Sequence, residues 1–142
     1  MAPQVYDWTC SACSLDWLLR STGADPNSNR EKVTYEIGYT ENINPTYGLM
    51  DGSGAQLRRV LAEFGLASNQ GWLDFESAYA VASLVPGMMS GSRWYHWVAV
   101  RGVLGNNLWI ANSAPGYKGV WDILSAYDYN RLGGFSVVWL AL

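Results

Sequence analysis

Cys10 and His96 are the residues of this chain best suited, by type and position, to nucleophilic catalysis. A thiol attacks as its thiolate, and a helix N-terminus lowers a thiol pKa because partial positive charge lies beside the sulfur. Thr9 is a favourable capping residue, so a helix that begins at Cys10 gives its sulfur this position, whereas Cys13 lies one turn further in. His96 is the only histidine, and therefore the only imidazole available as a general base.

Two amide side chains can complete such a site. Residues 105–107, Gly-Asn-Asn, are typical of a tight turn, and the hairpin that they predict returns Asn112 to the neighbourhood of His96. Asn112 can then accept the ring N–H through its side-chain carbonyl and hold the imidazole in one tautomer. Gln4, six residues before Cys10, is a candidate donor to the oxyanion, together with the backbone N–H of Cys10.

Three tryptophans flank these residues in the sequence and are candidates for the wall of a substrate groove. Hydrophobic packing is an equally good explanation for large aromatic side chains, so both interpretations stay open. The candidate substrate-binding residues are Trp8, Trp94 and Trp97.

Structural explanations compete with the catalytic one. A cysteine on an apolar helix is usually an inert small hydrophobe, and His96 lies between two aromatic residues that favour a core position. Asn112 could end a strand in an Asx turn before Pro115. Cys10 and Cys13 also have the spacing of a redox dithiol or half a zinc site, but only nine residues precede them and further cysteine or histidine ligands are too few. We therefore expect no metal and no cofactor.

The elements that must position these residues begin with helices. Apolar residues recur at helical spacing after Thr9, and Gly23 is a typical stop signal. Ser28 with Glu31 and Ser53 with Gln56 have capping-box spacing, and Asp74 can cap a further helix. A long polar loop should cover residues 39–54. The predicted helices cover residues 10–22, 28–37, 53–64, 75–84 and, near the C-terminus, 123–132.

Strand signals dominate the second half of the chain. Residues 94–103 are rich in Trp, Tyr and Val, the hairpin returns through 108–112, and 135–142 is a third apolar strand. Helices first and antiparallel strands later are typical of the α+β class, with the nucleophile helix and further helices packed on a C-terminal sheet.

Composition limits the remaining possibilities. At 142 residues, 49% of them hydrophobic and 15% charged, the chain is predicted to form one ordered domain over 1–142. A net charge of −3 without a basic stripe argues against nucleic acid as a partner. The sequence contains neither an apolar run of membrane-spanning length nor a signal peptide, so membrane insertion and Sec-type export are not expected.

Two segments carry a resemblance to a known family. Gln4–Leu19, QVYDWTCSACSLDWLL, resembles the Gln-x5-Cys-Gly-Pro-x-Ser-Leu opening of C39-like peptidases in the papain-like cysteine peptidase superfamily. His96–Gly116, HWVAVRGVLGNNLWIANSAPG, resembles their His-Trp-Val-Val-Val-x-Gly-Val strand, hairpin and Asp-Pro-Ala-x-Gly ending. Ser11-Ala12 replaces the family's Gly-Pro and Asn112-Ser113 its Asp-Pro; an asparagine is the orienting residue in papain itself.

The resemblance implies a papain-like fold and a cysteine hydrolase in which Cys10 is the nucleophile, His96 the base, Asn112 the orienting residue and Gln4 the oxyanion donor. Its compact form is also similar to peptidase modules of bacteriophage endolysins and tail-tip proteins. That implies a peptide substrate such as a peptidoglycan stem peptide, and a location in a virion assembly or release by lysis. The alternative is a catalytically silent structural or adhesion component of a phage tail with the same fold.

Overall fold

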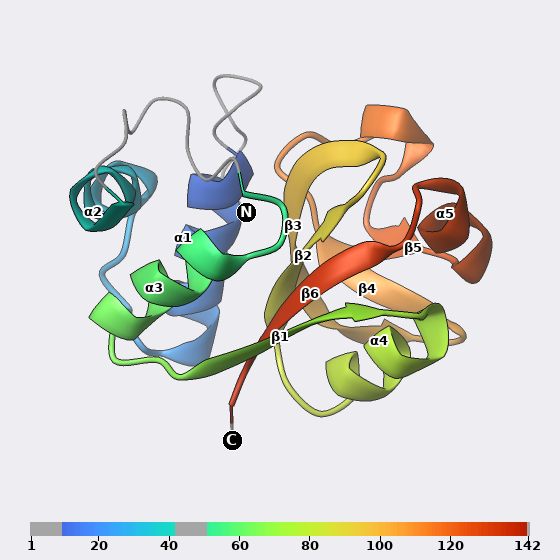
Figure 1. Cartoon of the computed structure of the whole chain (residues 1–142), viewed down its shortest axis with the longest axis horizontal. Coiled ribbons are helices and arrows are strands. Elements are labelled where there is room, and N and C mark those ends of the chain that lie inside the picture. Colours follow the sequence, from blue (N-terminus) through green and yellow to red (C-terminus); the bar gives the residue numbers. More distant parts are fainter. Residues whose placement is uncertain (1–9, 42–50, 142) are drawn as a thin grey trace.

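The computed structural model describes residues 10–41 and 51–141, so the predicted site residues Gln4 and Trp8 lie outside the described part of the chain. Within it, helices and strands follow one another as an α+β fold (Figure 1). The helices are α1 (Cys10–Thr22), α2 (Arg30–Glu41), α3 (Ala55–Glu63), α4 (Phe75–Ala82), the 3-10 helix η2 (Tyr117–Gly119) and α5 (Ala126–Arg131). The strands are β1 (Ser68–Leu73), β2 (Gly87–Gly91), β3 (Trp94–Leu104), β4 (Asn107–Ala111), β5 (Ile123–Leu124) and β6 (Phe135–Leu140).

The strands form one sheet in the order β1-β6-β2-β3-β4-β5, and every neighbouring pair is antiparallel. The hairpin of β3 and β4 pairs Leu104 with Asn107 at its turn and Ala99 with Ala111 near its open end. A register shift between Val100 and Gly102 interrupts this pairing. The predicted α+β class and the predicted hairpin are confirmed.

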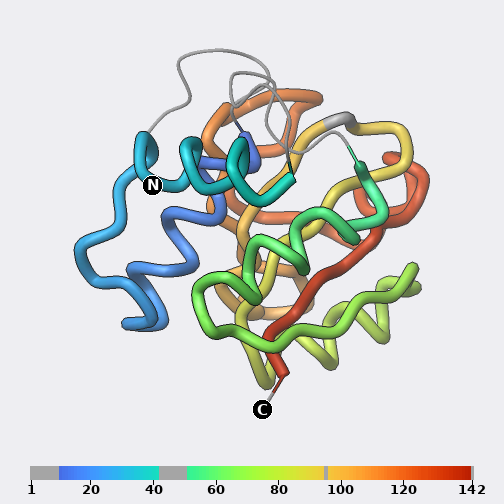
Figure 2. Tube along the Cα trace, turned by 60° about the vertical axis from the view of Figure 1, so that its left-hand side comes forward, coloured from blue at the N-terminus to red at the C-terminus, as the bar shows by residue number. Residues whose placement is uncertain are grey.

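The sheet is covered by helices on both faces, because successive residues of a strand point to opposite sides. Met88, Trp97 and Val138 join the cluster under α1, α2 and α3, whereas their neighbours Met89 and Val137 join the cluster under α4 and α5. The first three helices lie together on one side of the sheet in both views (Figures 1 and 2).

α1 has the bounds that the sequence predicts, and two hydrogen bonds join it to Trp97 of β3. Leu15 and Leu19 are completely buried in the core between the helix and the sheet. The Ser14 hydroxyl donates to the Trp97 carbonyl at 3.0 Å, and the Trp97 N–H donates to Cys10 Sγ at 3.3 Å. Because residues 10 and 14 are one turn apart on the helix, one face of α1 holds both backbone groups of Trp97.

Several boundaries differ from the sequence expectations. α2 begins at Arg30 and continues to Glu41, beyond the predicted end at residue 37. Gly54, not Ser53, caps α3, with a left-handed φ of 97°. A β-carbon at Gly54 would lie 2.4 Å from Val138 Cγ2, so the chain passes too close to β6 for a larger residue. Residues 51–54 are thus shaped by tertiary packing.

Three strands of the sheet, β1, β2 and β5, are also missing from the sequence expectations. β1 precedes α4, which contradicts the expected order of helices first and strands later. Residues 123–124 are a short strand paired with β4, and the helix that follows begins only at Ala126. The predicted Asp74 cap of α4 is confirmed, since its carboxylate accepts the Ser77 N–H at 2.8 Å.

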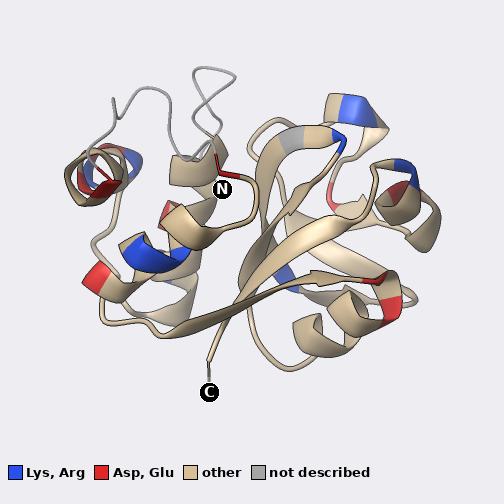
Figure 3. Ribbon diagram, in the orientation of Figure 1, with Lys and Arg blue, Asp and Glu red and all other residues tan. Residues whose placement is uncertain are grey.

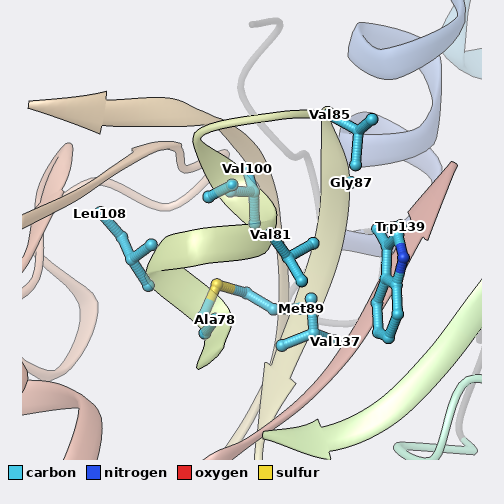
Figure 4. A pocket seen from close by; sticks show the side chains of 10 residues that line it. Ala78, Val81, Val85, Gly87, Met89, Val100, Leu108, Val137 and Trp139 are labelled. Carbon is cyan, nitrogen blue, oxygen red and sulfur yellow. The ribbon is translucent and has the colours of Figure 1, made fainter. Parts of the chain in front are cut away.

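A small apolar cavity of about 10 Å³ lies between α4 and the sheet (Figure 4). Ala78 and Val81 of α4 close it from one side, and side chains of β2, β3, β4 and β6 close it from the other. Its lining belongs to the cluster opposite α1, so this cavity is remote from Cys10 and is a packing defect of the core.

Candidate active site

Cys10 is the first residue of α1 and is 6% exposed. Burial raises the pKa of its thiol, while N–H groups of Trp97 and Ser11 that point at the sulfur lower it. The net direction is upward, which differs from the sequence expectation of a thiol acidified by the helix N-terminus. Desolvation of a thiolate outweighs the helix charge here, so the resting group is the thiol.

His96 lies near the start of β3 and is 3% exposed. Its Nε2 is 2.7 Å from Asn112 Oδ1, directly after the end of β4. Burial lowers the pKa of His96, and the hydrogen bond that the imidazole donates to Asn112 offsets part of that effect. The imidazole is therefore neutral at neutral pH and able to accept a proton.

The amide of Asn112 is held in one orientation by the loop that follows it. Its Oδ1 also accepts the Ala114 N–H at 2.9 Å, and its Nδ2 donates to the Val120 carbonyl at 3.1 Å. Turning the amide over would set two donors against each other at Ala114. With an oxygen facing it, His96 Nε2 carries the proton, which leaves the Nδ1 lone pair as the acceptor.

The fold also places the Cys10 sulfur against the backbone of Trp97, next to His96 in the chain. The hydrogen bond that Cys10 Sγ receives comes from Trp97, the residue directly after His96. This N–H favours a thiolate, and the S–H must turn toward Nδ1 of His96 for proton transfer. The helix thus supplies the Cys10 thiol and the sheet supplies the His96 imidazole, and β3 joins the two through the backbone of Trp97.

Cys13 is the second thiol of α1, and it is 1% exposed. No disulfide joins it to Cys10, and its proximity raises the pKa of Cys10.

Among the described residues, no three His, Cys, Asp or Glu side chains gather as metal ligands would. No helix in the same part of the chain is both long and apolar enough to cross a bilayer. The charged side chains are scattered over helices and loops, with Arg101 on strand β3 (Figure 3).

The two described tryptophans that the sequence nominated for substrate contact occupy core positions. Trp94 is 0% exposed and packs beside His96, with ring centroids 5.0 Å apart. Trp97 is 2% exposed and packs in the cluster under α1. Neither ring presents open surface, so their roles are to support the imidazole and to seat the nucleophile helix.

Sequence reasoning missed two contributors from the loop after Asn112. Tyr117 contacts the His96 ring edge to face, with centroids 5.6 Å apart, and Val120 supplies the carbonyl that orients Asn112. The glycines at 116 and 119, with left-handed φ values of 81° and 75°, are the local signals that this loop folds back. A contact made across the loop has no further signature in one sequence.

A buried cysteine at the start of the first helix, packed against an antiparallel sheet that carries a histidine–asparagine pair, defines a papain-like α+β architecture. No protein-family model and no curated protein sequence matches the chain. Solved structures do match it. One is a double-glycine-motif protease from an AMS/PCAT transporter in complex with the leader peptide, with a TM-score of 0.71, 16% identity, and coverage of 100% of this chain and 91% of that one.

The peptidase domain of Streptococcus ComA, a bifunctional ABC transporter involved in quorum sensing, matches with a TM-score of 0.67 and 15% identity over 99% of this chain and 96% of that one. The Streptococcus mutans ComA peptidase domain gives a TM-score of 0.58 and 13% identity over 100% and 98%. At these identities the likeness establishes the fold. The chain therefore has the fold of C39-type peptidase domains, as the sequence resemblance implies.

Proposed function

We propose that this protein is a cysteine hydrolase that cleaves peptide or amide bonds with Cys10, His96 and Asn112. The observation that carries the proposal is the 2.7 Å contact between His96 Nε2 and Asn112 Oδ1, with the amide orientation set by Ala114 and Val120. This arrangement directs the Nδ1 lone pair away from Asn112, as proton transfer from a thiol requires. The papain-like fold adds independent support.

In the proposed reaction, the Cys10 S–H proton moves to Nδ1 of His96, and the sulfur forms a bond to the carbonyl carbon. The resulting oxyanion accepts the backbone N–H of Cys10, and Gln4 is the proposed second donor. His96 then returns its proton to the leaving nitrogen as the C–N bond breaks, which leaves a thioester on Cys10. Water, deprotonated by His96, attacks the thioester and releases the acid and the thiol.

The proposed substrate is a peptide, and two kinds are distinguishable. The transporter protease with a similar fold holds a leader peptide. The sequence resemblance to phage modules favours instead a peptidoglycan stem or cross-bridge peptide, cleaved as part of a lytic or tail-tip apparatus. Incubation with purified wall peptides and with a pool of unstructured peptides, read by mass spectrometry, separates them. Cleavage of the pool alone would exclude the wall-specific version.

The test of the chemistry is acid quenching during turnover, followed by mass analysis of the protein. Wild type should carry an acyl group on Cys10 and release amine product. Cys10→Ala and His96→Ala should do neither, whereas Cys13→Ala, which removes the neighbouring buried thiol, should keep both. Turnover that survives in Cys10→Ala would overturn the proposal.

The second candidate is a structural component that keeps the fold without turnover. Two observations favour it: burial raises the pKa of the Cys10 thiol above its ordinary value, and Ser11-Ala12 stands where C39-like peptidases have Gly-Pro. It predicts a Cys10 that forms no acyl adduct with any peptide and alkylates only after unfolding.

A further inference from the structure

The loop between Asn112 and β5 carries two exposed aromatic side chains, and one of them, Tyr117, contacts the His96 imidazole. Tyr117 is 45% exposed and Trp121 is 64% exposed, although both lie on a loop with a buried anchor at Val120. We call Tyr117 and Trp121 the aromatic rim. Exposed rings on a well-held loop are typical of ligand contact, because their hydration is unfavourable and their ordering cost is already met.

Trp121 lies against the backbone that carries Tyr117. The Trp121 indole packs over Gly116, the residue before Tyr117, so closely that a β-carbon at Gly116 would lie 3.1 Å from Trp121 Cζ2. Gly116 takes a left-handed φ of 81° as well. The glycine therefore allows Trp121 to lie against the backbone that carries Tyr117.

The loop is held rigidly. The Gly116 N–H donates to the Val120 carbonyl at 2.9 Å, and that carbonyl also accepts from Asn112 Nδ2. Arg131 of α5 donates to the Lys118 carbonyl at 2.9 Å. The rim is thus tied to the same hydrogen bonds that orient Asn112, and it is preorganised for binding.

The proposed reaction determines which part of the substrate lies next to the aromatic rim. His96 has to reach the leaving nitrogen to protonate it, so the residue on the leaving-group side of the scissile bond lies next to the imidazole. Tyr117 contacts the His96 ring directly. Its ring also stacks on that of Trp94, with centroids 6.1 Å apart, and Trp94 is buried. Among the described side chains, Tyr117 is therefore an exposed ring in contact with His96, and Trp121 lies against the neighbouring residue Gly116.

We propose that the aromatic rim is the subsite for the leaving-group residue of the substrate, and that it selects a large apolar side chain, aromatic before aliphatic, over glycine. The proposal rests on the proposed function, because it takes His96 as the proton donor to the leaving amine. Lys118, whose Nζ lies 6.0 Å from the Tyr117 ring, sets a positive charge at the edge of the subsite and disfavours a basic side chain there.

The test uses amine products, which need no turnover. Phenylalaninamide and glycinamide carry the same amine and amide and differ only in the ring. In NMR titrations, phenylalaninamide should shift the resonances of the single His96 imidazole and of the Trp121 indole, and bind about fivefold more tightly than glycinamide. Trp121→Ala and Tyr117→Ala should remove this difference, and Cys10→Ser should keep it.

Trp72→Ala is the matched control, since Trp72 is an exposed tryptophan of β1, at the opposite end of the sheet order. Equal affinity for both amides, or an equal loss in Trp72→Ala, would overturn the subsite. Selective binding of phenylalaninamide without peptide cleavage would show that the rim binds an aromatic group, but it would overturn the hydrolase and with it the assignment of the rim to a leaving-group residue. Cleavage that is indifferent to the leaving-group residue would overturn the subsite and leave the hydrolase standing.

Discussion

Asn112 can be changed in two ways that move the pKa of His96 in opposite directions. Asn112→Ala removes the hydrogen bond that offsets burial, so the pKa of His96 should fall further below its ordinary value. Asn112→Asp keeps an oxygen opposite Nε2 and adds negative charge, so the pKa of His96 should rise. Comparing the two variants therefore shows whether the hydrogen bond between Asn112 and His96 sets the pKa of His96.

The cost to stability follows from the three hydrogen bonds of the Asn112 amide, with His96, Ala114 and Val120. Truncation to alanine leaves the His96 and Ala114 N–H groups unsatisfied and removes one of the two donors to the Val120 carbonyl, which keeps the Gly116 N–H. At about 1 kcal/mol for each lost hydrogen bond, the unfolding free energy should fall by about 3 kcal/mol. The aspartate keeps both contacts to Oδ1 and loses only the donor to Val120, so it should cost about 1–2 kcal/mol.

Asn112→Ala should also slow the acylation step. A hydrogen bond to the charged imidazolium contributes about 1.5–3 kcal/mol, which corresponds to about 10- to 100-fold in the acylation rate of Asn112→Ala. Its peptide cleavage should fall by that factor under conditions where the variant is folded.

The assay needs no resonance assignment, because His96 is the only histidine. Its imidazole C–H signal, followed against pH in wild type and both variants, reports the pKa directly, and urea unfolding gives the stability. Asn130→Ala, at an exposed position of α5, is the control that should change neither. If all variants titrate at the wild-type pH, the His96–Asn112 hydrogen bond is not formed in solution and the proposed site is wrong.

Three further predictions concern the surroundings of the site. Tyr117→Ala should let water reach His96 and raise its NMR-measured pKa toward the ordinary value, whereas Tyr117→Phe should leave it unchanged; equal behaviour of the two variants would contradict the packing role. Because burial raises the pKa of Cys10, its alkylation by iodoacetamide should accelerate mainly at alkaline pH, and a rate already maximal near pH 6 would contradict a resting thiol. Gly87→Ala should cost about 3 kcal/mol or more in urea unfolding, since a β-carbon there would lie 2.3 Å from the Val138 carbonyl, and an unchanged midpoint would show that β2 and β6 are further apart.

Features with local causes could be predicted from the sequence. The bounds of α1 and the Asp74 cap depend on residues within a few positions of one another, and the hairpin that returns Asn112 to His96 depends on one turn. β1 could not be predicted, because the polar sequence SNQGWL becomes a strand only by pairing with β6, 62 residues further along the chain at the closest register pair, Leu73 with Phe135. Tertiary pairing overrides weak local propensity there.

The pKa of Cys10 shows the same limit in energetic form. A helix N-terminus is visible in the sequence and predicts a lowered pKa, but burial is a property of the folded chain and acts in the opposite direction. The local argument thus predicted the wrong direction for the pKa of the resting Cys10 thiol, and the catalytic role of Cys10 stays a prediction. A position at a helix N-terminus is evidence for a nucleophile only once its exposure is known.

The backbone of Trp97 explains how the site can tolerate Ser11-Ala12 where C39-like peptidases have Gly-Pro. Ser11 and Ala12 are buried within α1, and the start of the helix is fixed by contacts with β3. The Trp97 N–H and carbonyl meet Cys10 and Ser14, one turn apart, so the strand that bears His96 also sets the height and rotation of the nucleophile helix. The separation of sulfur and imidazole therefore depends on a backbone contact, which a change of the two residues after Cys10 does not remove.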